Sequence, residues 1–578
     1  MPLQQDSACD EAKRATSLRP TLYATERPCL LKSALKWLFG YRLAIILIWL
    51  AAICLVDPRG NFALDDDWVY AAAVKHLVTT GHYRLPWSSV SLLTEALWGA
   101  LFCKLFGFSF VTLRWSILVL GIAGLVAFYE TILLLRIEPL LAFLGTLTVM
   151  FTPFFFNLSF TFMTDGFFCS CIMISVLLLL RNQETHSRRD LALGMCMALI
   201  ATLTRQLGLC IPLAWAIART VERPKGVKAW VTAWAPVALI GGALLAYMLI
   251  LKALGEMPSR YNPQGAFAVS ALRHPKILLH ALTSAIPEIL IYLGLFIAPA
   301  LPALWYTSRR NPAVLPRSSI AVCTLWVVCI TPVLLRLHKR IPFRGSTLED
   351  FRLGNYFDAN LPSLPSFVWY ALTAAGILGA CSIIVAIAVM IARNDAAIMP
   401  DLAKRRLRFL LLTVVIYFIP VFLVNDYLDR YVLPAIPLSL LALFLISNQG
   451  DTAKITLPKG YIITSFTLLA GIALFSILGT RDYLTYYRTA WEARRFVVSQ
   501  GVPPPLAFNV PDWGPAYFDG EYLNDDEMYM NGPVPHADSG YNVGTSVKPG
   551  YEVVRQYPFQ LKLNRRELTM YVSKREAR

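Results

Sequence analysis

Long apolar segments separated by short polar loops dominate this chain. A helix needs about 20 apolar residues to cross a bilayer, and some of the segments are shorter. The pattern therefore predicts an all-α polytopic membrane protein with about 13 transmembrane helices, some of them broken or half-buried. The segments are 41–56, 111–135, 139–158, 165–180, 190–203, 207–219, 229–251, 286–306, 319–337, 367–392, 408–424, 431–447 and 460–479. The pair 190–203 and 207–219 also fits one kinked helix.

Composition agrees with this class. Of 578 residues, 56% are hydrophobic and 16% are charged, whereas soluble domains carry about 25% charged residues. The formal net charge is +16, which in a soluble protein would suggest nucleic acid. Here the basic residues lie mostly in loops between apolar segments, where they set topology and meet anionic headgroups. We therefore expect membrane lipids as partners and no nucleic acid.

Basic loops also orient the chain. The positive-inside rule favours a cytoplasmic N-terminus. The loops that are then inside and rich in Lys and Arg are 181–190, 219–228, 309–317 and 393–408. The short outside connections carry at most one basic residue each, and they are 157–165, 203–207 and 425–430. The basic loop 336–352 falls outside, against the rule.

Three regions follow from this topology. We expect a cytoplasmic segment over 1–40, a transmembrane domain over 41–479 and a small extracytoplasmic α/β domain over 480–578. In that last region the sequence predicts a helix over 483–500 and strands over 506–510, 551–557 and 567–573. The outside loop 57–110 is expected to hold two helices that lie along the membrane interface, 68–80 and 92–108. The acidic residues 525–527 fit a solvated loop better than an acceptor site.

Three consecutive carboxylates, Asp65, Asp66 and Asp67, open the first outside loop. One interpretation is an acidic cap on an interfacial helix, because carboxylates suit the positive end of a helix dipole. The other is a catalytic site. The triplet by itself favours the cap, so its weight as a site depends on what else lies on the same side.

Asp165 is a lone carboxylate between two apolar segments, at the predicted outer boundary of the membrane. An ionisable group at that depth is costly and tends to mark a function, although an N-cap for the following helix is the alternative. The topology puts Asp165 on the same side as the acidic triplet. One carboxylate can then act as general base on an acceptor hydroxyl while another orients the substrate or holds a metal.

Two arginines, Arg205 and Arg430, also fall at the outer boundary, each beside an apolar segment. The guanidinium fork suits phosphate, and the alternative is snorkelling to headgroups. Arginines on the carboxylate side favour a phosphate site. Basic residues of the longer outside loops can add to it, and they are Arg260, His338, Lys339, Arg340 and Arg344. A lipid-linked phosphosugar that arrives from the bilayer fits this combination.

The order of these motifs resembles the GT-C superfamily of polytopic glycosyltransferases, in the branch of protein O-mannosyltransferases and lipid A aminoarabinose transferases. Members carry an acidic pair and a spaced tyrosine, often Asp-Glu-x-x-Tyr, which Asp66, Asp67 and Tyr70 match with Asp for Glu. The matching later motifs are Gly81-His82-Tyr83, Met163-Thr164-Asp165, Leu203-Thr204-Arg205 with Arg for Lys, and Arg430-Tyr431-Val432-Leu433-Pro434. The resemblance is strongest over 60–220.

The resemblance implies an inverting transfer of a sugar from a polyprenyl-phosphate donor to an acceptor hydroxyl outside the cytoplasm. The acceptor would be a glycolipid, a polysaccharide or a protein. The key carboxylate would be Asp66, as base or to orient the acceptor, with Asp165 in support. The shorter Asp67 replaces the family's Glu. Arg205 and Arg430 would bind the donor phosphate. The remaining supporting candidates are Asp65, Tyr70, Tyr83, Asp429, Tyr431, Arg340 and Arg344.

The family branch also favours a bacterial inner membrane with a periplasmic site. Family members differ in metal use, and no clear ligand set or required cofactor stands out in this sequence. The competing hypotheses are a transporter or lipid flippase, and a non-enzymatic scaffold that binds through the C-terminal region. A transporter would place charged residues along a pathway near the midplane, whereas the carboxylates here gather at one boundary.

Overall fold

The structure is a computed structural model of the chain, which divides into two compact units, Met1–Ala44 and Ile45–Arg578. The residues it describes are 40–85, 88–222, 226–258, 261–309, 317–337, 339–349, 352–354, 356, 361, 365–395, 400–424, 427–447, 457–502, 507, 540–563 and 565–576. The sequence-based predictions for 506 and 508–510, for 525–527, and for Arg260 and His338 fall outside these residues.

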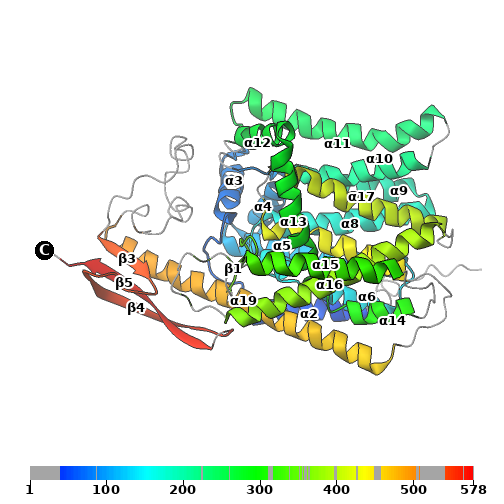
Figure 1. Cartoon of the computed structure of the whole chain (residues 1–578). Coiled ribbons are helices and arrows are strands. Elements are labelled where there is room, and N and C mark those ends of the chain that lie inside the picture. The colour runs from blue at the N-terminus through cyan, green and yellow to red at the C-terminus, as the bar shows by residue number, and fades with distance from the viewer. Residues whose placement is uncertain are drawn as a thin grey trace, which may run out of the picture. The chain divides into compact units, whose positions relative to one another are not determined.

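Helices form most of the described chain, as the apolar segments predict (Figure 1). Their bounds are α2 (Tyr41–Val56), α3 (Asp67–Thr80), α4 (Leu93–Phe106), α5 (Phe110–Leu134), α6 (Pro139–Met150), α7 (Pro153–Ser159), α8 (Thr164–Thr185), α9 (Arg188–Thr204), α10 (Cys210–Val221), α11 (Val227–Ala253), α12 (Tyr261–Arg273), α13 (Pro275–Phe296), α14 (Leu301–Arg309), α15 (Arg317–Arg336), α16 (Ser366–Asp395), α17 (Asp401–Val424), α18 (Ala435–Ser447) and α19 (Lys459–Ser499).

Among the described residues, seven helices are long and apolar enough to cross a membrane, or eight if the bent pair α6 and α7 counts as one span. Four further apolar helices are shorter. This agrees with an all-α polytopic membrane protein, while the number of about 13 crossings stays a prediction. In Figure 1, α8, α9, α10 and α17 lie side by side, and α8 contacts both α5 and α9.

Two predicted segments break where the backbone cannot continue a helix. Segment 139–158 bends by 63° between α6 and α7, at Thr152, which precedes a proline and has an extended ψ of 126°. Segment 190–219 breaks at Arg205, which is extended with φ −137° and ψ 128° and leads into the 3-10 helix η1 (Gln206–Leu209). Gly208 then approaches α9 so closely that an added Cβ would lie 2.5 Å from the Thr202 nitrogen. The break points the Arg205 side chain away from the helix line.

Helices α13 and α16 cross at glycines. A Cβ added at Gly294 would lie 2.3 Å from the Ala380 nitrogen, and one added at Gly379 would lie 2.2 Å from the Gly294 carbonyl oxygen. Small residues at membrane helix crossings let backbones approach and gain dispersion contacts. This crossing holds α13, which carries Glu288, against the bundle.

Helix α19 is continuous over 41 residues and reaches a three-stranded antiparallel sheet of order β3-β5-β4, with β3 (Tyr541–Gly544), β4 (Tyr551–Leu561) and β5 (Arg566–Arg575). The sheet contains the strands predicted over 551–557 and 567–573. The Asp482 carboxylate accepts hydrogen bonds from the Lys562 and Leu563 nitrogens at 2.7 and 2.9 Å, which fixes the β4–β5 turn to α19. The division into regions at 480 stays a prediction.

Candidate active site

The backbone conformation of the acidic loop and the buried Arg114 side chain together shape the loop. Asp65 has a left-handed φ of 50°, and Asp66 stands at the N-cap of α3 without a side-chain cap hydrogen bond. Arg114 of α5 lies beneath the loop, fully buried, and donates to the carbonyl oxygens of Pro58, Gly60 and Phe62. The left-handed residue turns the side chains of the triplet in different directions, so its members have different surroundings.

Asp67 is buried and braces two loops. Its carboxylate accepts hydrogen bonds from the Leu64 nitrogen at 2.6 Å and the Phe162 nitrogen at 3.4 Å. Burial raises the pKa of Asp67 to about 8 against the opposing effect of the Arg114 charge. Asp67 therefore joins the acidic loop to the turn that precedes Asp165, and its place as a catalytic carboxylate stays a prediction.

Asp165 and Arg205 form a buried ion pair. Asp165 lies in the first turn of α8, yet no side-chain cap hydrogen bond is formed there. Its Oδ1 accepts from Arg205 Nη1 instead, and the Arg205 guanidinium lies 5.0 Å from the centre of the Tyr431 ring. The Arg205 Nε is buried without a hydrogen-bond acceptor among the described residues. One donor of the fork is thus left for a ligand.

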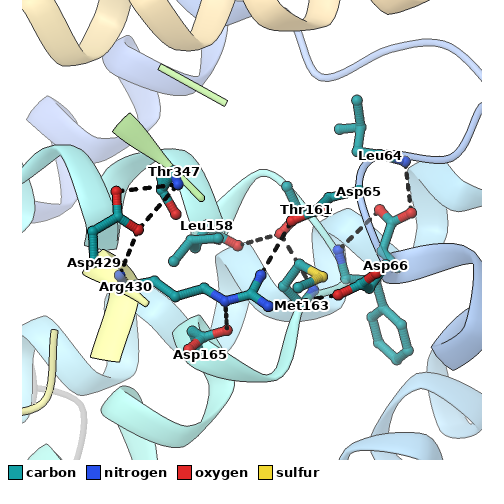
Figure 2. Close-up of polar contacts among 12 residues, drawn as sticks. Leu64, Asp65, Asp66, Leu158, Thr161, Met163, Asp165, Thr347, Asp429 and Arg430 are labelled. Carbon is teal, nitrogen blue, oxygen red and sulfur yellow. Dashed lines mark hydrogen bonds and ion pairs between the residues drawn. The ribbon is translucent and has the colours of Figure 1, made fainter. Parts of the chain in front are cut away.

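Arg430 is the centre of the cluster (Figure 2). Its Nη1 lies 3.1 Å from Asp65 Oδ2, its Nη2 lies 3.5 Å from Asp66 Oδ2, and its Nε lies 4.0 Å from Asp165 Oδ2. We name the set of Asp65, Asp66, Asp165, Arg205 and Arg430 the ionic cluster. It brings together residues from four distant segments, as the sequence predicts from their common side.

Asp429 fixes the position of Arg430. Its carboxylate accepts from the backbone nitrogens of Thr347, Leu348 and Arg430 itself, at 2.7 to 3.2 Å (Figure 2). The Thr347 turn leads into the short strands β1 (Leu348–Glu349) and β2 (Arg352–Leu353). Asp429 therefore supports the cluster through the backbone and ties the 344–349 loop to the 3-10 helix η2 (Asp429–Val432), which precedes α18.

Three tyrosines predicted as supporting residues lie near the cluster in different ways. Tyr70 of α3 is buried, and burial and the Asp66 charge raise its pKa. Tyr431 stacks beneath the Arg205 guanidinium, and its carbonyl oxygen accepts from the Tyr417 hydroxyl at 3.1 Å. Tyr83 stands apart, because its hydroxyl donates to the Ser91 carbonyl oxygen at 2.7 Å. Tyr83 thereby shapes the loop before α4.

Arg340 and Arg344 belong to a second basic group beside the cluster. Arg344 Nε lies 3.4 Å from Glu288 Oε2, and Lys339 Nζ lies 3.3 Å from Glu288 Oε1. The Arg340 guanidinium lies 5.8 Å from the Trp369 ring centre. The group adjoins the cluster through the backbone, since the Asp429 nitrogen donates to the Arg344 carbonyl oxygen at 3.2 Å.

A cavity of about 270 Å³ opens beside Arg205. Its lining residues come from the loop before α4 and from η1, α11, α12, α17 and η2, and they include Arg205, Gln206, Met248, Tyr261, Val421 and Tyr431. Ligand pockets usually hold about 300–1,000 Å³, so this one has room for a phosphate and the first carbons of a chain. The cation at its wall and the apolar remainder suit an amphipathic anion.

Carboxylates at this site face arginines rather than one another. No set of three or more His, Cys, Asp or Glu side chains within the described ranges is arranged to hold a metal ion. The Arg430 guanidinium is instead surrounded by three of the described carboxylates, Asp65, Asp66 and Asp165.

Sequence reasoning missed several buried charged residues, among them Arg114, Glu95 and Glu288. Arg114 is the one basic residue of the apolar segment 111–135, and a charge inside such a segment signals a structural or functional partner. Glu95 and Glu288 also stand in largely apolar surroundings. Their roles depend on the face of the helix that is buried, which spacing alone did not single out.

Comparison with known proteins finds neither a matching family model nor a matching curated protein. Among solved structures, the chain is similar to ArnT from Cupriavidus metallidurans in the apo state, with 14% identity, 88% of this chain and 87% of that chain covered, and a TM-score of 0.37. It is also similar to the same protein bound to undecaprenyl phosphate, with 12% identity and a TM-score of 0.38. That match covers 93% of this chain and 98% of the other. A third similar structure is an Archaeoglobus fulgidus oligosaccharyltransferase tethered with an acceptor peptide that contains the NVT sequon. The identity is 13%, the TM-score is 0.39, and the match covers 87% of this chain and 60% of the other. The GT-C superfamily stays the group that the sequence motifs of this chain resemble.

Proposed function

We propose that this chain is a membrane glycosyltransferase that moves a sugar from a polyprenyl-phosphate donor to an acceptor hydroxyl, with inversion at the sugar carbon. The observation that carries the proposal is the ionic cluster beside the apolar cavity. Two arginines and three carboxylates from four segments of the chain meet beside a cavity that a lipid phosphate can enter laterally. The arginines of the cluster can bind a phosphate, and its carboxylates can accept a proton.

Arg205 and Arg430 are the proposed donor site. Each guanidinium has a buried Nε without a hydrogen-bond acceptor among the described residues, and Arg205 also lines the cavity. Preorganised guanidinium groups stabilise the charge that develops on a departing phosphate. In this proposal the lipid chain occupies the apolar part of the cavity and the phosphate meets the two free N–H groups.

Asp66 is the proposed base. Its side chain is 35% exposed, against 16% for Asp65 and 5% for Asp165, so it is the cluster carboxylate that an acceptor reaches most easily. The hydroxyl oxygen bonds to the sugar carbon as the carbon–oxygen bond to the phosphate breaks. Asp66 takes the hydroxyl proton, and the phosphate leaves with the bonding electrons. The supporting carboxylate, Asp165, orients Arg205 and Arg430.

The proposed setting is a bacterial inner membrane, with the N-terminus in the cytoplasm and the cluster and C-terminal region on the periplasmic side. The acceptor is a glycolipid, a polysaccharide or a protein. The basic loops between apolar segments support the orientation. Asp67, Tyr70, Tyr83, Tyr431, Arg340 and Arg344 support the site by holding the loops around it.

The test uses the full chain in nanodiscs with a panel of polyprenyl-phosphate sugars and measures the release of free polyprenyl phosphate. We expect release by the wild type and loss of release in Asp66→Asn, with donor binding retained. Asp57→Asn is the matched control, because Asp57 pairs with Arg59 outside the cluster, and it should keep turnover. Near-normal turnover of Asp66→Asn would remove Asp66 as the base. Movement of intact donor across the bilayer without release would favour the transporter hypothesis.

A further inference from the structure

Helix α4 presses a narrow, partly polar face against the turn that carries Asp165. Glu95 and Gly99, one turn apart, are buried on this face, while Leu97 and Leu101 on the other side are about half exposed. A Cβ added at Gly99 would lie 2.7 Å from the Phe162 ring. Because Phe162 lies three residues before Asp165, the close approach brings the buried face of α4, which carries Glu95, to the turn that leads into Asp165.

Glu95 is a buried carboxyl group that has no hydrogen-bond partner in the part of the chain that the structure describes. It is 0% exposed, and neither of its carboxyl oxygens has a hydrogen-bond donor among the described residues. The groups that act on it electrostatically are Asp165 and Arg205, and it acts in turn on Cys171 of α8 and on Tyr83. Burying an ionised carboxylate without hydrogen-bond donors costs a large amount of free energy. Burial and the Asp165 charge raise the pKa of Glu95 well above its usual range.

The charge balance of the ionic cluster leads to the same conclusion. Three carboxylates face two arginines, so the cluster carries a formal charge of −1 before an anionic donor arrives. An ionised Glu95 would add another negative charge close to the arginine that has to bind phosphate. A neutral Glu95 avoids this repulsion.

We propose that Glu95 is a positioning residue that stays protonated and donates its O–H to Asp165 when the donor phosphate takes the Arg205 guanidinium. The inference rests on the proposed function. Asp165 loses its closest partner when Arg205 turns to the phosphate, since Arg430 Nε stands 4.0 Å away. A carboxylic acid supplies a replacement hydrogen bond without adding charge. In this proposal the Glu95 hydroxyl, which has no hydrogen-bond partner among the described residues, gains its acceptor when Asp165 is released by Arg205.

The first experiment measures the proton directly. Infrared spectra of the wild type and of Glu95→Gln in nanodiscs at neutral pH should differ by one carboxylic-acid C=O band, which the variant lacks. Glu552→Gln, at an exposed glutamate on β4, is the matched control and should lower only the carboxylate band. Equal acid bands in the wild type and Glu95→Gln would overturn the proposal. This measurement needs no turnover, so it separates failure of the proposal from failure of the proposed function.

The second experiment measures the affinity for polyprenyl phosphate. Glu95→Gln keeps a donor group and should bind within about threefold of the wild type, whereas Glu95→Leu should bind about 10- to 100-fold more weakly, because a hydrogen bond to a charged group is lost. Leucine removes a buried orphan carboxyl, so folding is retained. Wild-type affinity in Glu95→Leu, or strong loss in Glu95→Gln, would contradict a neutral hydrogen-bond donor.

Discussion

Removal of the Arg430 side chain tests whether the ionic cluster is a charged network. In Arg430→Ala, Asp65, Asp66 and Asp165 lose the cation that stands 3.1, 3.5 and 4.0 Å from them. Breaking a buried ion pair costs about 3–5 kcal/mol, because the partner is left uncompensated. The 35% exposure of the Asp66 side chain lets water screen part of the repulsion. We therefore expect a loss of about 3 kcal/mol in the free energy of unfolding.

The assay is unfolding of the purified chain in mixed micelles, run at neutral and at acid pH. The matched control is Arg488→Ala, which removes an arginine that donates to the Asp57 and Arg59 carbonyl oxygens outside the cluster. Acid pH should restore part of the stability of Arg430→Ala, because the three carboxylates can take up protons once the cation is gone. The reasoning is refuted if the loss matches that of Arg488→Ala and does not change with pH.

Three further predictions follow from the fold and the site. The Asp67 pKa of about 8 in the folded chain, against 3.8 as the ordinary value, means that the native state holds a proton that the unfolded state releases. Stability should therefore fall as pH rises from about 4 through about 8, and unfolding of Asp67→Asn over the same range should show a flatter profile. Gly294→Leu should destabilise the α13–α16 crossing by about 1–3 kcal/mol or more, measured by thermal unfolding, whereas Gly471→Leu, where a Cβ meets nothing within 4 Å, should not. Asp429→Asn weakens the hydrogen bonds from the Thr347 and Leu348 nitrogens, so it should lower donor affinity about tenfold in a polyprenyl-phosphate binding assay. Unchanged affinity would show that the loop is held by other contacts.

The sequence predicts most helices because apolar length is a strong signal in membrane proteins. The apolar segments all fall on helices, and the predicted kink at Arg205 is a real break. Helix α12, between the apolar segments 229–251 and 286–306, was not expected, and α13 begins at Pro275 rather than at 286. Both stretches are more polar than the spans, so hydropathy alone does not reveal them.

The convergence of Asp66, Asp165, Arg205 and Arg430 was predictable because topology alternates sides with each crossing. The separate surroundings of Asp66 and Asp67 were not, because they depend on the left-handed backbone at Asp65 and on hydrogen bonds from Leu64 and Phe162. Such differences arise from tertiary contacts between residues about 100 positions apart, which spacing along the chain does not encode.

The 41 residues of α19 make a rod about 60 Å long at the usual rise, roughly twice the hydrocarbon thickness of a bilayer. Near the middle of the rod, the Ser476 hydroxyl donates to the Phe151 carbonyl oxygen at 2.7 Å, and six residues further along Asp482 holds the β4–β5 turn. These two contacts lie about 9 Å apart along the helix. The end of α6 at Phe151 and the β4–β5 turn are therefore joined through one short stretch of α19. Displacing the sheet is thus expected to move the chain that leads through α7 into Asp165.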